Sequence, residues 1–468
     1  MQQLPPGQAQ AVVVVPDSVP FLLALRLWWR IGWLSFGGPA GQIALMHREL
    51  VEQRRWVSEP RFLHALNYCM LLPGPEAQQL AVYVGWLLHR TWGGIVAGAL
   101  FVLPGALVLG VLSWLYVSFG TVPIVTALFF GLKAAILAVV VEAVLRIGRR
   151  ALKTRFLQAV AVAAFLALHA LGVAFPLIVL GAALTGLAIG RMRPAWLPAL
   201  HGEDSGGDDA DSVVDRMLAR GDAAHTTPSL PRALRTGLVC IALWMAPVAL
   251  AALWLGPQHI LVREGVFFSQ TALVTFGGAY AVLAFVAQRA VEDFGWLQPG
   301  EMVDGLALAE TTPGPLVLVL QFVGFLAAYR YAAPLDPWLG AALGAAITAW
   351  VIFIPSFLFI FAGAPWIESL RRHRGLHSAL STITAAVVGV ILNLAIWFAL
   401  HTVFGDVVRL RAGALDMDVP VWTSLEPGAA MLSLAALVAM LRFRLGLGWT
   451  LLASAMLGAA YWMLRYGT

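Results

Sequence analysis

Two short groups of Gly and Pro residues interrupt apolar segments of this chain, and each group occurs twice. The copies are Phe36-Gly37-Gly38, Trp56 and Pro73-Gly74-Pro75, and then Phe276-Gly277-Gly278, Trp296 and Pro313-Gly314-Pro315. The spacing is the same in both copies, and 11 of the 40 aligned residues are identical. Most of the identical residues are Phe, Gly, Pro and Trp, which set backbone shape and membrane depth. We therefore interpret the two groups as an internal repeat.

Interrupted helices at membrane depth can bind anions. A helix that restarts after a break presents unsatisfied N–H groups and the positive end of its dipole, so main-chain atoms alone form an anion site. Freed backbone is tolerated there only inside protein or along a polar cavity. Close helix packing is the alternative explanation for Gly and Pro, but two copies in register favour a cavity. The predicted substrate-binding positions at the breaks are Gly37, Gly38, Pro73, Gly74, Pro75, Gly277, Gly278, Pro313, Gly314 and Pro315.

Ionisable side chains in apolar segments are costly and often functional. Glu310 lies three residues before the second Pro-Gly-Pro, and burial favours the neutral form of a carboxyl group. We predict that Glu310 carries a proton, with a structural carboxylate that caps nearby backbone as the alternative. Lys133 lies in the middle of the segment 122–145 and is predicted to supply positive charge to an anion.

Three amide side chains complete the predicted site. Gln78 and Gln79 follow the first Pro-Gly-Pro within one turn and are placed to donate hydrogen bonds to an oxyanion, and Asn393 is placed to line the cavity. Asn393 occupies the position that Glu142 occupies in the first half. Glu142 itself is expected to pair with Arg146, four residues later on the same helix face.

Composition places these motifs in a membrane protein. The 468 residues are 60% hydrophobic and 12% charged, with a mean hydropathy of +0.82, whereas a soluble protein is about a quarter charged. We predict an all-α polytopic membrane protein, because apolar runs of 18 or more residues recur and each can cross the bilayer. The net charge of +5 needs no nucleic acid to explain it. Two cysteines and scattered histidines give no disulfide framework and no metal or cofactor site, and no nucleophile–base pair indicates an enzyme.

The apolar segments define two halves. Residues 1–20 are predicted to be a tail without a signal peptide, 21–190 the first repeat, 191–234 a polar cytoplasmic linker, 235–256 a connecting transmembrane helix, and 257–468 the second repeat. Four segments contain the breaks: 21–47, 62–88, 259–287 and 302–328. The continuous segments are 93–119, 122–145, 155–171, 172–190, 338–363, 376–400, 428–441 and 445–465.

The repeat continues beyond the two groups with a changed offset. Pro104 matches Pro355, and Glu142 matches Asn393, each 251 residues apart. The first matches are 240 residues apart, so the later ones are 11 residues further apart. This difference indicates an insertion near Tyr329–Pro337, where a loop is expected.

Charge placement predicts the orientation of the halves. The basic run Arg146–Arg155 places that loop in the cytoplasm, and the single segment 235–256 then inverts the second half, as in many secondary transporters. The loop 405–420 is expected outside. The broken segments either span the membrane or fold back as re-entrant hairpins. Hairpins place the arginine-rich loop 48–61 inside and the acidic loop 289–301 outside, so we prefer them.

The motifs resemble those of the chromate ion transporter family in its long, two-domain form. The resemblance rests on FGGPAGQIALMHRELVEQRRWVSEPRF and LLPGPEAQQLAVYVGW in the first half, and on TFGGAYAVLAFV, ALAETTPGPLVLVLQFVGF and ITAAVVGVILNLA in the second. This chain has Met70-Leu71-Leu72 where the family often has a small residue or Gln, which argues against a side-chain role there in the first half.

The resemblance implies a multi-pass carrier in the bacterial inner membrane that exports chromate, driven by the proton-motive force, with protons as coupling ion and chromate resistance as the result. Sulfate is a structural analogue, so sulfate uptake is an alternative, and an uncoupled anion channel is another. The oligomeric state is open, with a homodimer as one alternative.

Overall fold

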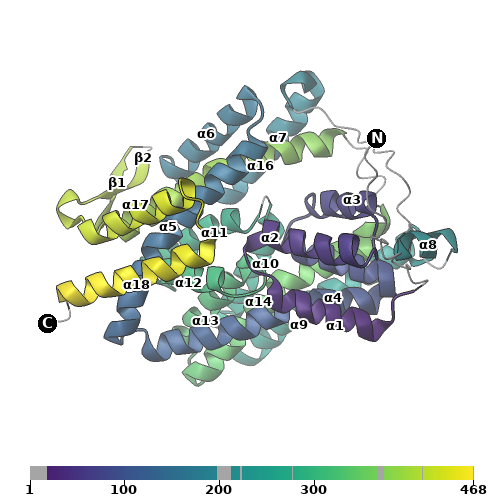
Figure 1. The fold of residues 1–468 in the computed structure, drawn as a ribbon, viewed down its shortest axis with the longest axis horizontal. Coiled ribbons are helices and arrows are strands. Elements are labelled where there is room, and N and C mark those ends of the chain that lie inside the picture. The colour runs from purple at the N-terminus through teal and green to yellow at the C-terminus, as the bar shows by residue number, and fades with distance from the viewer. Residues whose placement is uncertain are drawn as a thin grey trace, which may run out of the picture.

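The computed structural model describes residues 18–197, 212–221, 224–276, 278–366, 374–413 and 415–466, and most of them are helical (Figure 1). Seven of the described helices are long and apolar enough to cross a membrane, which confirms an all-α polytopic membrane protein. These helices are α4 (Glu76–Phe119), α5 (Pro123–Ala151), α7 (Phe175–Met192), α9 (Leu230–Leu255), α14 (Pro337–Gly363), α16 (Arg374–Val403) and α18 (Leu447–Tyr466).

The Phe-Gly-Gly motifs separate two pairs of short helices. Helix α1 (Phe21–Leu34) ends before the first motif and α2 (Gly38–His47) begins within it, while α10 (Ile260–Val274) and α11 (Ala279–Ala287) flank the second. Gly37 and Gly278 have φ values of +83° and +101°, a region that favours glycine. Gly277 lies outside the described residues.

The Pro-Gly-Pro motifs separate two further pairs. Helix α3 (Glu59–Cys69) precedes the first motif and α4 follows it, and α12 (Pro299–Thr311) precedes the second. A 3₁₀ turn, Leu316–Leu318, then leads into α13 (Val319–Tyr331). Gly74 and Gly314 both have positive φ, +119° and +94°.

Helix α4 consists of two antiparallel parts. His89 and Arg90 have non-helical dihedral angles, and Arg90 has φ of +56°. The chain reverses there. The two parts pack side by side, since a Cβ atom on Gly85 would lie only 2.4 Å from the carbonyl oxygen of Gly93. Helices α13 and α14 form the corresponding pair in the second half, with Gly324 against Thr348. Small residues thus let both helix pairs pack closely.

The remaining elements surround this centre. Helix α6 (Arg155–His169) packs with α7 against α16, and α17 (Pro427–Leu441) packs with α18 against α5. The predicted loop 405–420 forms an antiparallel hairpin of β1 (Val407–Ala412) and β2 (Leu415–Pro420). The polar linker contains a short helix, α8 (Val213–Ala219), and α9 begins five residues earlier than predicted. Residues 198–211 and 222–223 of the linker lie outside the described residues.

Two loops contact elements from distant parts of the chain. In the loop 48–61, the carbonyl oxygens of Arg55 and Trp56 accept hydrogen bonds from the N–H groups of Val213 and Val214 at the start of α8. On the other half, Glu292 pairs with Arg409 of β1 at 2.9 Å. The arginine-rich loop therefore lies against the linker, and the acidic loop lies against the β-hairpin.

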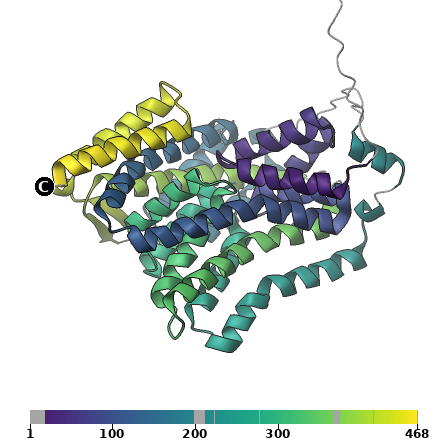
Figure 2. The same cartoon turned by 60° about the horizontal axis from the view of Figure 1, so that its bottom comes forward.

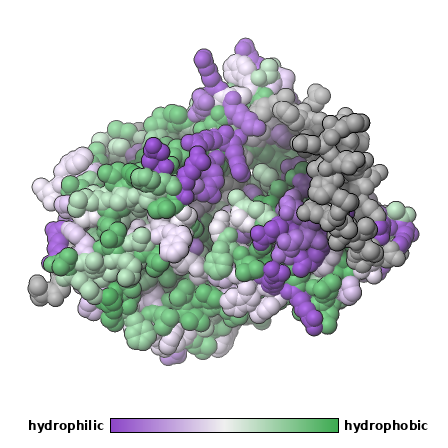
Figure 3. All heavy atoms as spheres, viewed as in Figure 1, coloured by the Kyte–Doolittle hydropathy of each residue, from purple (hydrophilic) through white to green (hydrophobic). Residues whose placement is uncertain are grey.

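Apolar side chains cover much of the surface. The face in Figure 3 is largely green, with polar side chains gathered in patches. Helix α9 lies along the outside of the bundle (Figure 2), and Leu238, Leu253 and Trp254 on it are exposed. Exposed apolar surface on this scale fits contact with lipid.

Candidate functional site

Each Pro-Gly-Pro turn is hydrogen-bonded to the break of the other half. The N–H group of Gly74 donates to the carbonyl oxygen of Thr275 at 2.8 Å, and the N–H group of Gly314 donates to that of Ser35 at 2.8 Å. Ser35 and Thr275 each precede a Phe-Gly-Gly motif, and both are buried. Both bonds join corresponding positions, since Thr275 and Gly314 lie 240 residues after Ser35 and Gly74.

Each turn also packs against the proline-containing helix of the other half. A Cβ atom on Gly105, which follows Pro104 in α4, would lie 2.1 Å from the carbonyl oxygen of Pro313. A Cβ atom on Gly74 would lie 3.4 Å from Oγ of Ser356, which follows Pro355 in α14. The first turn thus meets the second Phe-Gly-Gly segment and α14, and the second turn meets the first Phe-Gly-Gly segment and α4. Gly74 and Gly314 are buried at these crossings, whereas Phe36 and Gly37 are exposed.

Glutamine side chains donate hydrogen bonds to backbone carbonyl oxygens at both Pro-Gly-Pro turns. Gln79 donates to the carbonyl oxygen of Pro73 at 2.7 Å, and Gln78 donates to that of Phe353 at 3.4 Å. The sequence interpretation missed Gln42, a buried residue of α2 that donates to the carbonyl oxygen of Gly314 at 2.7 Å. A glutamine four residues after Gly38 in an apolar helix was the available signal. The oxyanion-donor role of Gln78 and Gln79 stays a prediction, because their amide groups hold backbone carbonyls here.

Lys133 pairs with a carboxylate that sequence reasoning missed. Its Nζ lies 3.2 Å from Oδ2 of Asp304 in α12, and Tyr116 of α4 donates to the same oxygen at 2.9 Å. The other carboxylate oxygen of Asp304 is buried and has no partner among the described residues. Asp304 lies six residues before Glu310 in the same apolar segment, which was the signal for it. The charge of Lys133 is thus compensated within the protein.

A double-variant cycle tests whether Lys133 has a role beyond this pair. Lys133→Met should lower the free energy of unfolding by about 3–5 kcal/mol, because it leaves the buried carboxylate of Asp304 unpaired. Lys133→Met combined with Asp304→Asn should recover most of that loss in thermal unfolding of detergent-solubilised protein. If the double variant folds but does not transport, Lys133 contributes charge to the anion; full transport would limit Lys133 to the ion pair.

Glu310 lies beside the second break. Its Oε1 accepts a hydrogen bond from Tyr280 at 2.6 Å, and Tyr280 follows Gly278 at the start of α11. Glu310 also interacts electrostatically with Arg146 and Glu142 of α5. The predicted Glu142–Arg146 pair is confirmed at 2.5 Å. The charges at the C-terminal end of α5 therefore act on the carboxyl group of Glu310.

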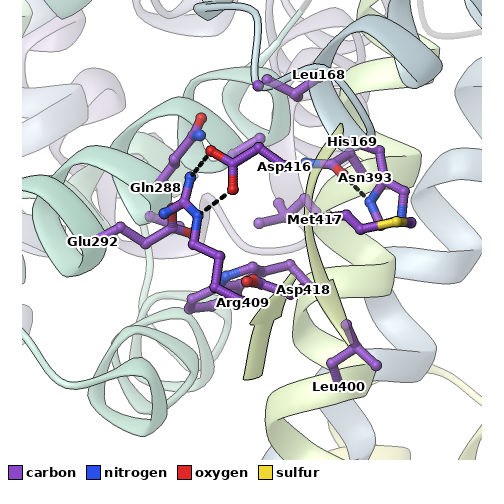
Figure 4. Close-up of a pocket in the computed structure, with 15 residues that line it drawn as sticks. Leu168, His169, Gln288, Glu292, Asn393, Leu400, Arg409, Asp416, Met417 and Asp418 are labelled. Atoms are coloured by element: carbon purple, nitrogen blue, oxygen red, sulfur yellow. Dashed lines mark hydrogen bonds and ion pairs between the residues drawn. The ribbon is translucent and has the colours of Figure 1, made fainter. Parts of the chain in front are cut away.

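Asn393 lines a pocket away from the breaks (Figure 4). Its Oδ1 lies 2.9 Å from Nδ1 of His169. The pocket is also lined by residues of the β-hairpin and of the π-helical turn Gln288–Asp293, which follows α11. None of the described residues of the Phe-Gly-Gly and Pro-Gly-Pro motifs lines this pocket. The structure therefore separates Asn393 from the other predicted substrate-binding residues.

The repeated motifs lie within regions that match a known family. The family model described as chromate transporter matches residues 22–187 and 263–459. The chain belongs to the chromate transporter family. Each matched region of this chromate transporter contains one Phe-Gly-Gly and one Pro-Gly-Pro motif.

Curated relatives cover most of this chromate transporter. A chromate transport protein of Pseudomonas aeruginosa is 33% identical over 381 residues, 80% of each chain. A chromate transport protein of Cupriavidus metallidurans is 27% identical over 80% of this chain and 81% of its own. A probable chromate transport protein of Synechococcus elongatus is 27% identical over 78% and 81%. No solved structure matches the chain.

Proposed function

We propose that this protein exports chromate across the bacterial inner membrane as a secondary active transporter, driven by the proton-motive force, and so confers chromate resistance. The observation that carries the proposal is that each Pro-Gly-Pro turn bonds to the backbone just before the Phe-Gly-Gly motif of the opposite half. Membership in the chromate transporter family and relatives named as chromate transport proteins support the substrate.

The breaks supply donors that suit a tetrahedral dianion. Helix α4 begins at Glu76 directly after Pro75, and α13 begins shortly after Pro315. The first-turn N–H groups of a helix have no acceptor within the helix and carry the positive end of its dipole. Two such helix starts, one after each turn, stabilise negative charge with few charged side chains.

We infer that the four broken segments are re-entrant hairpins and that the halves are inverted repeats. The loop 48–61 bonds to the linker at Val213 and Val214, and the acidic loop pairs through Glu292 with the β-hairpin. Since positive charge places the linker inside and the hairpin outside, the two loops lie on opposite sides. Alternating access then consists of rocking one half against the other around the turns that join them.

Cysteine labelling tests the hairpins. We expect a membrane-impermeant maleimide to label Gln53→Cys only in inside-out vesicles and Asp293→Cys only in right-side-out vesicles, because the two exposed positions lie on opposite sides. The natural cysteines, Cys69 and Cys240, are buried and serve as the unlabelled background in the parent protein. Labelling of Gln53→Cys from the outside would require full spans.

The membrane potential supplies much of the driving force for export. Moving one elementary charge through 100 mV is worth about 2.3 kcal/mol, so a dianion that leaves a negative interior gains about 4.6 kcal/mol. This corresponds to a concentration ratio of more than about a thousandfold. A pH gradient adds to this force only where protons move in exchange, which is the role proposed for Glu310.

Proteoliposomes with imposed gradients test the proposal. We expect chromate to leave vesicles with a negative interior, and also to move under a pH gradient at zero potential. Flux that follows the potential but ignores the pH gradient indicates an uncoupled channel instead. No chromate flux under either gradient would disprove chromate transport.

Sulfate uptake is the competing substrate assignment, because sulfate is also a tetrahedral dianion. Cells that express the protein should hold less chromate and survive higher chromate concentrations than cells without it. Greater sulfate accumulation with unchanged chromate would favour the sulfate assignment.

A further inference from the structure

A pocket lined by arginine lies at the C-terminal end of α5. The last turns of α5 contribute Arg146, Arg149 and Arg150, and the turn between α17 and α18 contributes Arg444. The pocket has a volume of about 740 Å³, which leaves room for an anion with part of its water. Four arginines and Glu142 give it a net charge of +3, since 4 − 1 = 3.

Most of this positive charge is uncompensated. Arg146 pairs with Glu142 at 2.5 Å, whereas Arg149, Arg150 and Arg444 have no carboxylate partner among the described residues. Arginine presents several N–H donors in a plane and suits oxyanions with two or more oxygen atoms. The pocket thus has free donors for such an anion.

The pocket adjoins the region of the breaks. Arg146 interacts electrostatically with Tyr280 and Glu310, and Tyr280 is hydrogen-bonded to Glu310 beside the second break. Because α5 also packs against α12, which carries Glu310, an anion bound by Arg146 would act on the charge of Glu310.

The pocket around Asn393 has the opposite charge. Arg409 lies between Glu292 and Asp416, at 2.9 Å and 2.6 Å, and Asp418 also lines the pocket (Figure 4). With ionised carboxylates and neutral histidine its net charge is −2, since 1 − 3 = −2. The hydrogen bond from Arg409 lowers the pKa of Asp416, while burial raises the pKa of Glu292. Its volume is only about 50 Å³.

The two pockets occupy corresponding places in the two halves. Glu142 and Arg146 line the basic pocket, and their partners at an offset of 251, Asn393 and Trp397, line the acidic pocket. The C-terminal end of α17 lines the basic pocket, and the β-hairpin that lines the acidic pocket lies just before the N-terminal end of α17. The orientation predicted from charge places the basic pocket inside and the acidic pocket outside.

We propose that the arginine pocket is a docking site that collects tetrahedral oxyanion dianions from the cytoplasm, and that the acidic pocket disfavours their return. This inference rests on the proposed function and identifies where its substrate enters. Charge at a binding cleft raises the local concentration and the association rate of an oppositely charged ligand by about 10–1,000-fold. Such asymmetry changes the rates at the two faces and leaves the equilibrium to the gradients.

Transport measured separately from each face tests the proposal. Arg149→Gln combined with Arg150→Gln should raise the chromate KM at the cytoplasmic face about tenfold, with kcat and the outer-face KM unchanged. The salt dependence of the cytoplasmic KM should weaken in parallel, because screening acts on exposed charges. Arg235→Gln is the matched control, since Arg235 is an exposed arginine at the start of α9 and does not line the pocket.

The lipid headgroup is a second source of the same phosphate-like chemistry. The flux is therefore measured in purely zwitterionic vesicles and in vesicles with about 30% phosphatidylglycerol, since basic pockets at the cytoplasmic side also bind lipid headgroups. A KM effect in zwitterionic vesicles supports substrate docking. An effect that requires phosphatidylglycerol, an equal rise at both faces, or an unchanged KM would each overturn it. Absence of wild-type chromate flux would instead disprove the proposed function.

Discussion

Replacing either Pro-Gly-Pro glycine with valine is expected to lower chromate flux more than tenfold while the protein still inserts in the membrane. Gly74 and Gly314 have φ of +119° and +94°, and a β-branched residue at such an angle is strained by about 1–3 kcal/mol. A Cβ atom on Gly74 would also lie 2.9 Å from Nε2 of Gln79, and one on Gly314 would lie 3.1 Å from Cδ1 of Leu318. Either turn would therefore shift, and the hydrogen bond to the opposite half would be distorted.

The structure selects the control for this experiment. A Cβ atom on Gly181 of α7 meets nothing within 4 Å, so Gly181→Val should leave flux and folding unchanged. Gly186 on the same helix is unsuitable, because a Cβ atom there would lie 2.5 Å from Oγ1 of Thr382 in α16. Flux is normalised to the amount of monodisperse protein by fluorescence-detected gel filtration. Normal flux in both turn variants would show that the turns serve packing alone.

The helical class and the places of the breaks followed from the sequence because both depend on local properties. Long apolar runs predict membrane helices, and the helices do end at Leu34 and Cys69 and restart at Gly38 and Glu76. Glu142 and Arg146 are four residues apart on one helix, so their pairing was also predictable. The structures of the polar linker and of the β-hairpin were harder to predict, because short polar segments become ordered only through contacts with distant residues such as Arg55 and Glu292.

The contacts across the two halves were not predictable. No local feature of the sequence indicates that Gly74 bonds to Thr275, or that Lys133 pairs with Asp304 instead of being free to bind an anion. Such pairs depend on how helices from distant segments are placed, and one sequence carries no information on that. The same limitation explains why Asn393 was assigned to the region of the breaks although it lines a separate pocket with His169.

Glu310→Gln is expected to abolish the flux driven by a pH gradient at zero membrane potential, with a loss of at least about tenfold. Glutamine has nearly the same shape and keeps an oxygen that accepts the hydrogen bond from Tyr280, so the fold should be retained. It cannot bind and release a proton, so any proton exchange through this position stops. The measurement uses the proteoliposomes described above, with the two gradients imposed one at a time.

Two variants separate the proton from the rest of the site. Tyr280→Phe removes the hydrogen bond of 2.6 Å but keeps the carboxyl group, so its flux should still respond to the pH gradient. Glu264 of α10 is another buried carboxyl group, and neither of its oxygens has a partner among the described residues. Since it lies against Gly344 of α14 and not beside a break, Glu264→Gln should keep the response as well. A normal response in Glu310→Gln together with a lost response in Glu264→Gln would move the proton site to Glu264 and leave Glu310 a structural partner of Tyr280.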